Sequence, residues 1–235
     1  KSTYLGIFLI HFGLVLLIIG SGLTSWLGEE MNIAIKEDSY KSYVEHPNDF
    51  ELVLIDQSHP TADILYTLPI NKLYKSTPAD LNGLTFELNQ GYPNAYINQR
   101  GIINKKYEEM GLDFKLISLP KTYKMDERNI PGVDVFISNN QQLIGRFIFW
   151  GGADIYQELM IDNRPYLIAL RPKRTYLPFQ IYLNDFKMAS YDRSSIAESY
   201  ESNVTIRTNS SSFNSVISMN QPLRFSGYTF FQASF

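Results

Sequence analysis

An uncharged stretch near the start of the chain most constrains what this sequence can fold into. Residues 4–27 read YLGIFLIHFGLVLLIIGSGLTSWL, which is 24 residues without Asp, Glu, Lys or Arg. At about 1.5 Å per residue, a helix of that length spans a bilayer core of ~30 Å. A cleaved signal peptide has a shorter apolar centre of about 7–15 residues, although residues 20–25 supply the small side chains of a cleavage site. We therefore predict a transmembrane helix over residues 1–28 and keep a signal peptide as the alternative.

The charges that flank this stretch predict its orientation. Lys1 precedes the apolar residues, while Glu29 and Glu30 follow them. The positive-inside tendency then places residue 1 in the cytoplasm, so that residues 29–235 form an extracytoplasmic domain. Glycines recur along the stretch and let a neighbouring helix approach closely. The chain starts at Lys1 without a Met, and we expect it to be a fragment of a larger membrane protein.

Alternation of apolar and polar residues predicts strands through most of residues 29–235. The expected strands lie within residues 50–54, 84–88, 114–119, 133–137, 143–150, 155–161, 166–170, 179–183, 202–207, 216–219 and 228–232. Residues 92–110 alternate poorly and predict a short helix. We expect a mainly β fold, an antiparallel sandwich or an open barrel-like domain, preceded by the one transmembrane helix.

Composition excludes several function classes. A net charge of −3 argues against a nucleic-acid partner, and the chain has no cysteine for disulfides, thiolate metal sites or a haem-attachment CxxCH signature. The histidines His11, His46 and His59 form no HxxH pair. Gly151-Gly152 resembles a hairpin turn that uses glycine for positive φ rather than a phosphate loop. No motif predicts a catalytic residue.

His11 is the unusual residue of the apolar stretch. An imidazole about seven residues into a membrane span must find a hydrogen bond or a metal, because desolvation is otherwise costly. One interpretation is that His11 bonds a hydroxyl on a neighbouring helix. The other is that His11 is an axial ligand to a haem iron between helices, since a neutral imidazole nitrogen suits iron.

A basic string is the second candidate site. Arg171, Lys173 and Arg174 follow an apolar strand and precede aromatic residues, at what we predict to be a turn between strands. Such cations bind carboxylates, including haem propionates or carboxylates of a partner protein. The alternative is a positively charged turn that keeps a sheet edge soluble.

Three stretches carry a family likeness: residues 11–28, with HFGLVLL, GSG and WLG; residues 170–186, with LRPKRTYLPF and LNDF; and the closing residues 218–235, SMNQPLRFSGYTFFQASF. In these stretches the sequence resembles the ResB family, also called CcsB, of the cytochrome c biogenesis machinery known as system II. The closing stretch is the most specific of the three. Residues 50–165 match the family only in general character.

The resemblance implies a fold and a set of partners. In that family several membrane helices accompany a large extracytoplasmic β-rich domain, and a CcsA or ResC partner presents haem to a CxxCH apocytochrome from a tryptophan-rich segment. This chain has only Trp26 and Trp150, so we expect no haem attachment by this chain alone. The family's membrane haem is held by histidines of both partners, which implies that His11 supplies one axial ligand and the partner the other.

The sequence therefore predicts a component of the system II cytochrome c maturation complex. We expect it to support haem export across the membrane and haem delivery to apocytochrome c, with its helix in contact with lipid. The membrane would be the cytoplasmic membrane with the domain in the periplasm, or a thylakoid membrane with the domain in the lumen. The alternative is a single-span anchored extracytoplasmic domain that binds a ligand or acts as a sensor.

Overall fold

The structure is a computed structural model that describes residues 2–75, 78–124, 127–190 and 197–232. The chain divides into two compact units, residues 1–31 and residues 32–235. The first unit contains helix α1 (Ser2–Leu27). From Tyr4 to Leu27 this helix is long and apolar enough to cross a membrane, and none of that window is buried inside the protein. The prediction of one apolar N-terminal helix is confirmed.

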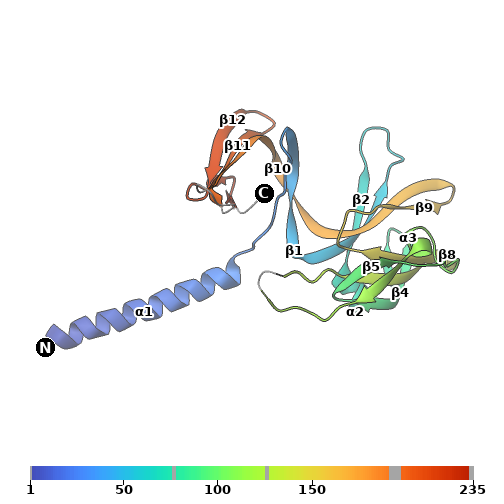
Figure 1. Ribbon diagram of the computed structural model, residues 1–235, viewed down its shortest axis with the longest axis horizontal. Coiled ribbons are helices and arrows are strands. Elements are labelled where there is room, and N and C mark those ends of the chain that lie inside the picture. The colour runs from blue at the N-terminus through green and yellow to red at the C-terminus, as the bar shows by residue number, and fades with distance from the viewer. Residues whose placement is uncertain (1, 76–77, 125–126, 191–196, 233–235) are drawn as a thin grey trace. The chain divides into compact units, whose positions relative to one another are not determined.

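The second unit consists mainly of antiparallel strands (Figure 1), as predicted. Its elements in chain order are β1 (Ser39–Asp56), β2 (Ile64–Pro69), α2 (Ile70–Lys75), β3 (Ala79–Leu81), β4 (Leu84–Tyr92), β5 (Ala95–Gln99), α3 (Met110–Asp113), β6 (Phe114–Ser118), β7 (Gly132–Asn139), β8 (Gln142–Trp150), β9 (Gln157–Ile161), β10 (Arg164–Ser190), β11 (Ala197–Arg207), β12 (Ser212–Ser218), β13 (Leu223–Phe225) and β14 (Tyr228–Phe230).

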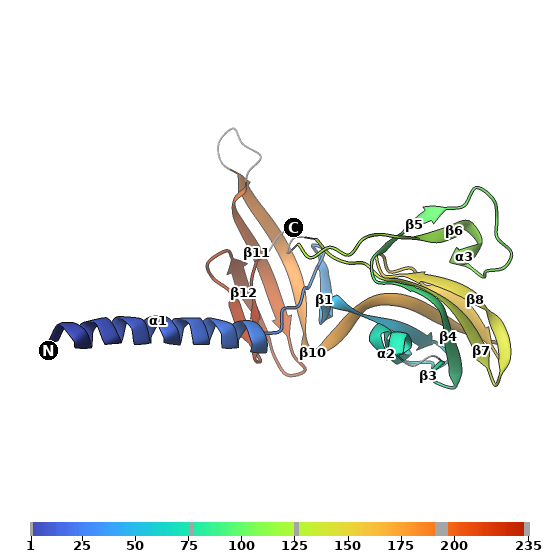
Figure 2. The same ribbon diagram turned by 90° about the horizontal axis from the view of Figure 1, so that it is seen from below.

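Two long neighbouring strands, β1 and β10, connect both ends of this unit. The largest sheet has the order β12-β11-β10-β1-β2, and β9 also pairs with β10. The end of β1, residues 50–56, pairs with residues 166–172, whereas its beginning pairs with residues 174–183. Figure 2 shows β10 passing from the side of β11 and β12 towards β7 and β8. Because the strands are shared, the two ends of the domain are parts of one sheet.

At one end, the shared strands form a sandwich with the sheet of order β3-β4-β7-β8. Its core consists of aliphatic and Phe side chains from both sheets. Leu52 and Leu54 of β1 and Val135 of β7 are fully buried, at 0% exposure. Burying a side chain of this size contributes about 1.5–3 kcal/mol. Successive residues of a strand point to opposite faces, so Leu52 and Leu54 both point into this core.

At the other end, β10, β11 and β12 form the C-terminal sheet, and the β13–β14 hairpin packs on it through aromatic rings. The Phe179 ring makes T-shaped contacts with Phe225, Tyr228 and Phe230, at centroid distances of 4.9, 6.1 and 6.2 Å. Phe225 also meets Phe213 of β12 at 5.2 Å. Edge-to-face pairs of this kind add about 0.5–1.5 kcal/mol each beyond the area they bury.

The turn predicted between residues 170 and 179 is wrong, because β10 continues without interruption from Arg164 to Ser190. The prolines that suggested a turn lie at irregularities of the β1–β10 ladder. Register shifts occur between Glu45 and Phe50, opposite Pro172, and between Lys41 and Tyr43, opposite the segment that contains Pro178. A proline, which has no N–H to donate, is tolerated in a strand at such a bulge.

The structure differs from two further local predictions. Residues 92–110 contain β5 and a loop, and helix α3 begins only at Met110. Gly151 and Gly152 do form a turn, but neither has a positive φ. Glycine is needed there for space: a Cβ on Gly151 would lie 2.6 Å from the Phe50 ring, and one on Gly152 would lie 2.1 Å from the Trp150 ring.

Candidate functional site

His11 lies exposed on helix α1, one turn after Ile7. Its Nδ1 is 2.8 Å from the carbonyl oxygen of Ile7, and because a carbonyl only accepts, Nδ1 carries the proton and donates it. In the neutral ring this leaves Nε2 unprotonated, with a lone pair directed away from the helix backbone. A backbone carbonyl that fixes one ring nitrogen in this way commonly orients a histidine whose other nitrogen binds a metal.

Aromatic side chains flank His11 on the same side of the helix. Phe8 and Phe12 stack on each other with centroids 6.1 Å apart and ring planes 10° apart. His11 is three residues after Phe8 and one before Phe12, so helical periodicity places all three on one side. Flat aromatic surfaces beside an imidazole with a free nitrogen suit a planar macrocycle such as haem.

The described part of the chain supplies a single histidine to such a site. It contains no group of three or more His, Asp or Glu side chains that could hold a metal ion. Among the other histidines, His46 Nε2 lies 2.8 Å from the Thr175 hydroxyl, and His59 Nδ1 accepts from the Thr61 backbone N–H at 3.4 Å. A haem bound through His11 would therefore take any second ligand from outside the described residues.

Arg171 forms a buried ion pair across the two long strands. It stands directly opposite Glu51 in the β1–β10 ladder. Its Nε and Nη2 donate to Glu51 Oε1 at 3.2 and 3.1 Å, and the two side chains are only 3% and 7% exposed. Removing one member of such a pair is strongly destabilising, because it leaves the other charge buried without a partner.

Arg174 forms a second cluster on the other side of the register shift. Its Nε donates to Glu45 at 2.9 Å and its Nη2 to Asp154 at 3.0 Å, while the guanidinium lies 4.2 Å from the centre of the Tyr43 ring. Burial opposes the charge, but Tyr43, Glu45 and Asp154 outweigh it and raise the pKa of Arg174. Burial also raises the pKa of Tyr43, against the effect of Arg174. Arg174 thus ties β1, β10 and the turn before β9 together.

Lys173 differs from its two neighbours because its side chain is exposed and forms no ion pair within the described residues. The three basic residues therefore lie on one strand, β10, but their side chains have different partners. Both arginines are engaged by carboxylates of this chain, and only Lys173 presents its charge to solvent. A role of Arg171, Lys173 and Arg174 in contacts with propionates or with a partner stays a prediction.

The carboxylate partners of these arginines were missed by sequence reasoning. Glu51 and Glu45 lie 120 and 129 residues before the arginines they bind. The available signal was Glu51 itself, a charged residue between Phe50 and Leu52 in an otherwise apolar run. A charge in such a run is almost never buried unless it is paired.

Fold and site together define a class: a bilayer-length helix with one histidine, joined to an antiparallel β-domain whose two long strands are held by one buried and one partly buried ion pair. Comparison with known proteins shows a similarity to one family. Residues 161–235 match the ResB-like family. The chain is also 26% identical to protein NrfI of Wolinella succinogenes, over 97% of this chain and 23% of NrfI. The chain thus spans about a quarter of the length of this relative.

The predicted resemblance to the ResB family is confirmed, and the family match has a definite place in the fold. It begins at the end of β9 and covers β10 to β14, which are the C-terminal sheet, its hairpin and the string from Arg171 to Arg174. Residues 233–235, which close the sequence stretch that suggested the family, lie outside the described residues.

Proposed function

We propose that this chain is a membrane-anchored, β-rich component of a system II cytochrome c maturation complex. The match of residues 161–235 to the ResB-like family carries this proposal. Haem is cargo in this scheme: the complex exports it across the membrane and delivers it to a CxxCH apocytochrome c. The thioether chemistry belongs to a CcsA- or ResC-type partner in this scheme.

In this proposal α1 provides a dry site for haem within the membrane. The Ile7 carbonyl holds the His11 ring with Nδ1 protonated, so that Nε2 is oriented to bind iron. Phe8 and Phe12 offer apolar surface beside it. The partner supplies the opposite axial ligand, and the lipid around the helix keeps water away from the site.

The β-domain, residues 29–235, stands outside the cytoplasm in this proposal, in the periplasm or in a thylakoid lumen, and braces the partner. Arg171 and Arg174 act by fixing the register of β1 against β10 through their carboxylates. The exposed Lys173 between them is suited to meet a carboxylate of the partner or a haem propionate.

The test of this function uses the full-length parent protein co-expressed with its partner. We expect His11→Ala to lose the haem absorbance of the purified membrane complex and to abolish maturation of a reporter cytochrome c. His11→Asn is the matched control for structure, because its amide nitrogen takes the place of the imidazole Nδ1 and can still donate towards the Ile7 carbonyl, but it does not bind haem iron; it should also lose the haem. His59→Ala, in a loop, should retain it.

Two results would contradict the proposal. An unchanged haem spectrum in His11→Ala removes His11 from the site. Normal cytochrome c maturation in cells that lack the parent protein removes the function itself. Addition of imidazole to His11→Gly membranes provides a further check, since recovery of the haem band indicates that the lost group is an iron ligand.

A further inference from the structure

We propose that the loop between β5 and β6 docks on the surface of a lipid bilayer that contains anionic headgroups. The docking segment, residues 100–106, is called here the isoleucine loop and reads RGIINKK. The inference rests on the proposed membrane anchoring by α1 and adds a second membrane contact, made by the β-domain. Figure 2 shows the β5–β6 connection extending away from the neighbouring strands.

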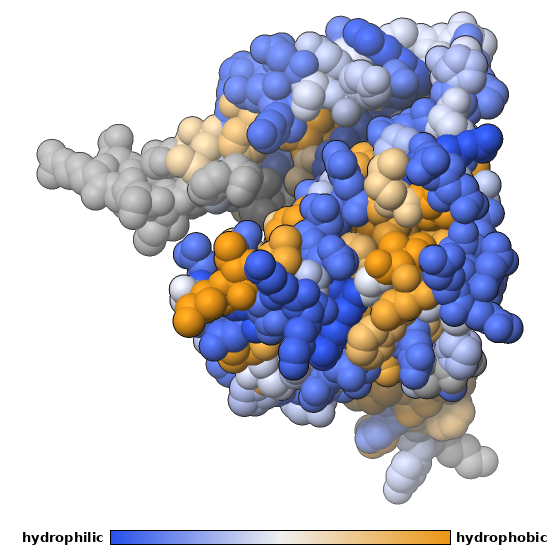
Figure 3. All heavy atoms as spheres, turned by 90° about the vertical axis from the view of Figure 1, so that its right-hand side faces the viewer, coloured by the Kyte–Doolittle hydropathy of each residue, from blue (hydrophilic) through white to orange (hydrophobic). Residues whose placement is uncertain are grey.

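The first observation is the exposure of two adjacent isoleucines. Ile102 is 86% exposed and Ile103 is 61% exposed. Figure 3, which views the end of the domain near α3 and β8, shows hydrophobic side chains at the surface between hydrophilic ones. Single exposed apolar residues are common, but two adjacent large ones at a loop tip suit insertion among lipid chains.

The second observation is that the loop is held in place. Arg100 N donates to the Asp113 carbonyl at 2.6 Å, and Asn104 N donates to the Leu112 carbonyl at 3.0 Å. The Arg100 side chain also donates from Nε to the Phe114 carbonyl at 2.7 Å. These bonds close the base of the loop, so the exposure of the isoleucines is part of a defined conformation.

A cation–π stack fixes the loop to the sandwich. The Tyr107 ring lies between Arg100 and Arg146, 4.8 and 4.4 Å from the two guanidinium carbons. Its hydroxyl donates to Asp134 at 3.2 Å, and Asp134 is itself bound by Arg146. Arg146 and Asp134 belong to β8 and β7, and the isoleucine loop is therefore braced on a rigid sheet.

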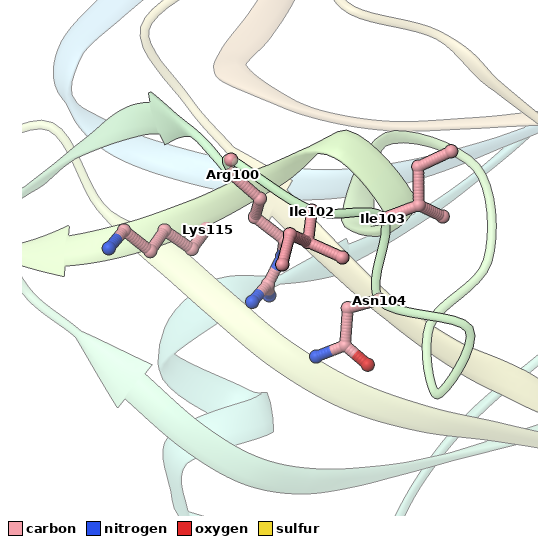
Figure 4. A pocket seen from close by; sticks show the side chains of 6 residues that line it. Arg100, Ile102, Ile103, Asn104 and Lys115 are labelled. Carbon is pink, nitrogen blue, oxygen red and sulfur yellow. The ribbon is translucent and has the colours of Figure 1, made fainter.

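The third observation is the charge around the isoleucines. The isoleucine loop contains Arg100, Lys105 and Lys106 and no acidic residue. Of these cations, Arg100 lines a shallow hollow of about 490 Å³ together with Ile102, Ile103, Asn104 and Lys115 of β6 (Figure 4). The nearest acidic residues in sequence, Glu108 and Glu109, follow the loop, and Glu108 packs against Gly145.

An anionic lipid surface matches both properties of this loop. Acyl chains complement Ile102 and Ile103, while lipid phosphates complement Lys105 and Lys106. A helix of bilayer length in the same chain keeps such a surface at high local concentration, so a weak second contact is sufficient. A folded protein partner would supply apolar surface, but nothing in the loop specifies one.

The absence of cysteine from the sequence makes a direct test simple. The full chain is prepared as Ile103→Cys, labelled with the fluorophore NBD, and reconstituted into vesicles of phosphatidylcholine alone or of equal parts phosphatidylcholine and phosphatidylglycerol. Spin-labelled lipids then quench a probe that enters the bilayer. Ser210→Cys, in the exposed turn between β11 and β12, is the matched control position.

We expect the probe at residue 103 to be blue-shifted and quenched in the phosphatidylglycerol vesicles, and the probe at residue 210 to stay water-exposed. Lys105→Gln/Lys106→Gln should lower the ratio of bilayer-inserted to water-exposed probe, on the order of fivefold for each lysine. A probe at residue 103 that stays water-exposed overturns the proposal, as does equal quenching in both lipids. Shielding that occurs only when the partner protein is added also overturns it, in favour of a protein interface.

Resistance of the reconstituted chain to carbonate extraction reports the α1 anchor separately. A chain that resists extraction while residue 103 remains in water contradicts only the loop contact. A chain that is extracted contradicts the membrane anchoring on which the proposed function rests.

Discussion

The sandwich and the C-terminal sheet share β1 and β10, yet they differ in what packs on them: a second sheet covers the sandwich strands, and an aromatic hairpin covers the C-terminal sheet. The sandwich buries aliphatic side chains such as Leu52, Val135 and Ile137 completely. The C-terminal sheet also buries aliphatic residues such as Ile206, but the β13–β14 hairpin packs on it through a cluster of rings centred on Phe179. The family match covers residues 161–235 and therefore the second region.

The two kinds of packing restrict the sequence to different degrees. Aliphatic core residues can replace one another at little cost when volume is kept, so a sandwich core leaves only a pattern of alternation. Ring pairs and buried ion pairs depend on particular side chains in particular geometry. Three experiments follow from these differences in packing and charge.

The largest effect is expected from the ion pair at the junction of the two regions. Arg171→Ala leaves Glu51 charged and buried, so we expect it to lower the free energy of unfolding by about 3–5 kcal/mol. Chemical denaturation measures this through the fluorescence of Trp150, in a Trp26→Phe background. Glu51→Leu/Arg171→Met, which removes both charges, should recover most of the loss. Equal stability of the single and double variants would show that the loss comes from packing.

The next prediction compares the loss of unfolding free energy caused by a core substitution in each region. Phe179→Leu should cost about 2–3 kcal/mol, because it removes ring contacts with the β13–β14 hairpin as well as volume. Leu54→Met, a change in the sandwich core that keeps the side-chain volume, should cost less than about 1.5 kcal/mol. Both values come from the same denaturation measurement. Similar costs at the two positions would remove the contrast between the regions.

The smallest effect is a loss of stability at alkaline pH. Burial raises the pKa of Tyr74, in α2, from 10.0 to about 12. The folded state then holds this proton more tightly than the unfolded state does, so the contribution is complete below pH 10 and is lost as the pH rises towards 12. The effect is modest because the side chain is 37% exposed.

Tyr74→Phe should therefore flatten the fall in urea midpoint between about pH 10 and 12. Tyr123→Phe is the matched control, since Tyr123 is 91% exposed and the variant should behave like the wild type. A Tyr74→Phe variant with the full alkaline loss would assign that loss to other groups.

Alternation predicted most strands correctly because the domain is built from half-buried antiparallel strands. It missed β2, β3, β5 and β13, and it also failed where the β1–β10 ladder is irregular. The beginning of β1 was missed because residues 46–49, HPND, interrupt the pattern at a register shift. The prolines of β10 were interpreted as a turn for the same reason: a bulge tolerates the residues that otherwise end a strand.

The candidate sites show a similar division. The local signals were sufficient to single out His11 and the string from Arg171 to Arg174, since each stands out among its sequence neighbours. The pairing of Arg171 with Glu51 depends on the fold, because these residues meet only when β1 and β10 align. The hydrogen bond from His11 to Ile7 follows from helical geometry and was not anticipated.

The continuity of β1 and β10 has a consequence for cooperativity. No flexible linker joins the sandwich to the C-terminal sheet; the same two backbones pass through both. Moving one region relative to the other would break hydrogen bonds between β1 and β10. We therefore expect no hinge motion between the two regions. We expect residues 32–235 to unfold in a single transition. We also expect a structural change at the β13–β14 hairpin to alter the twist of β10 and so to affect the sandwich.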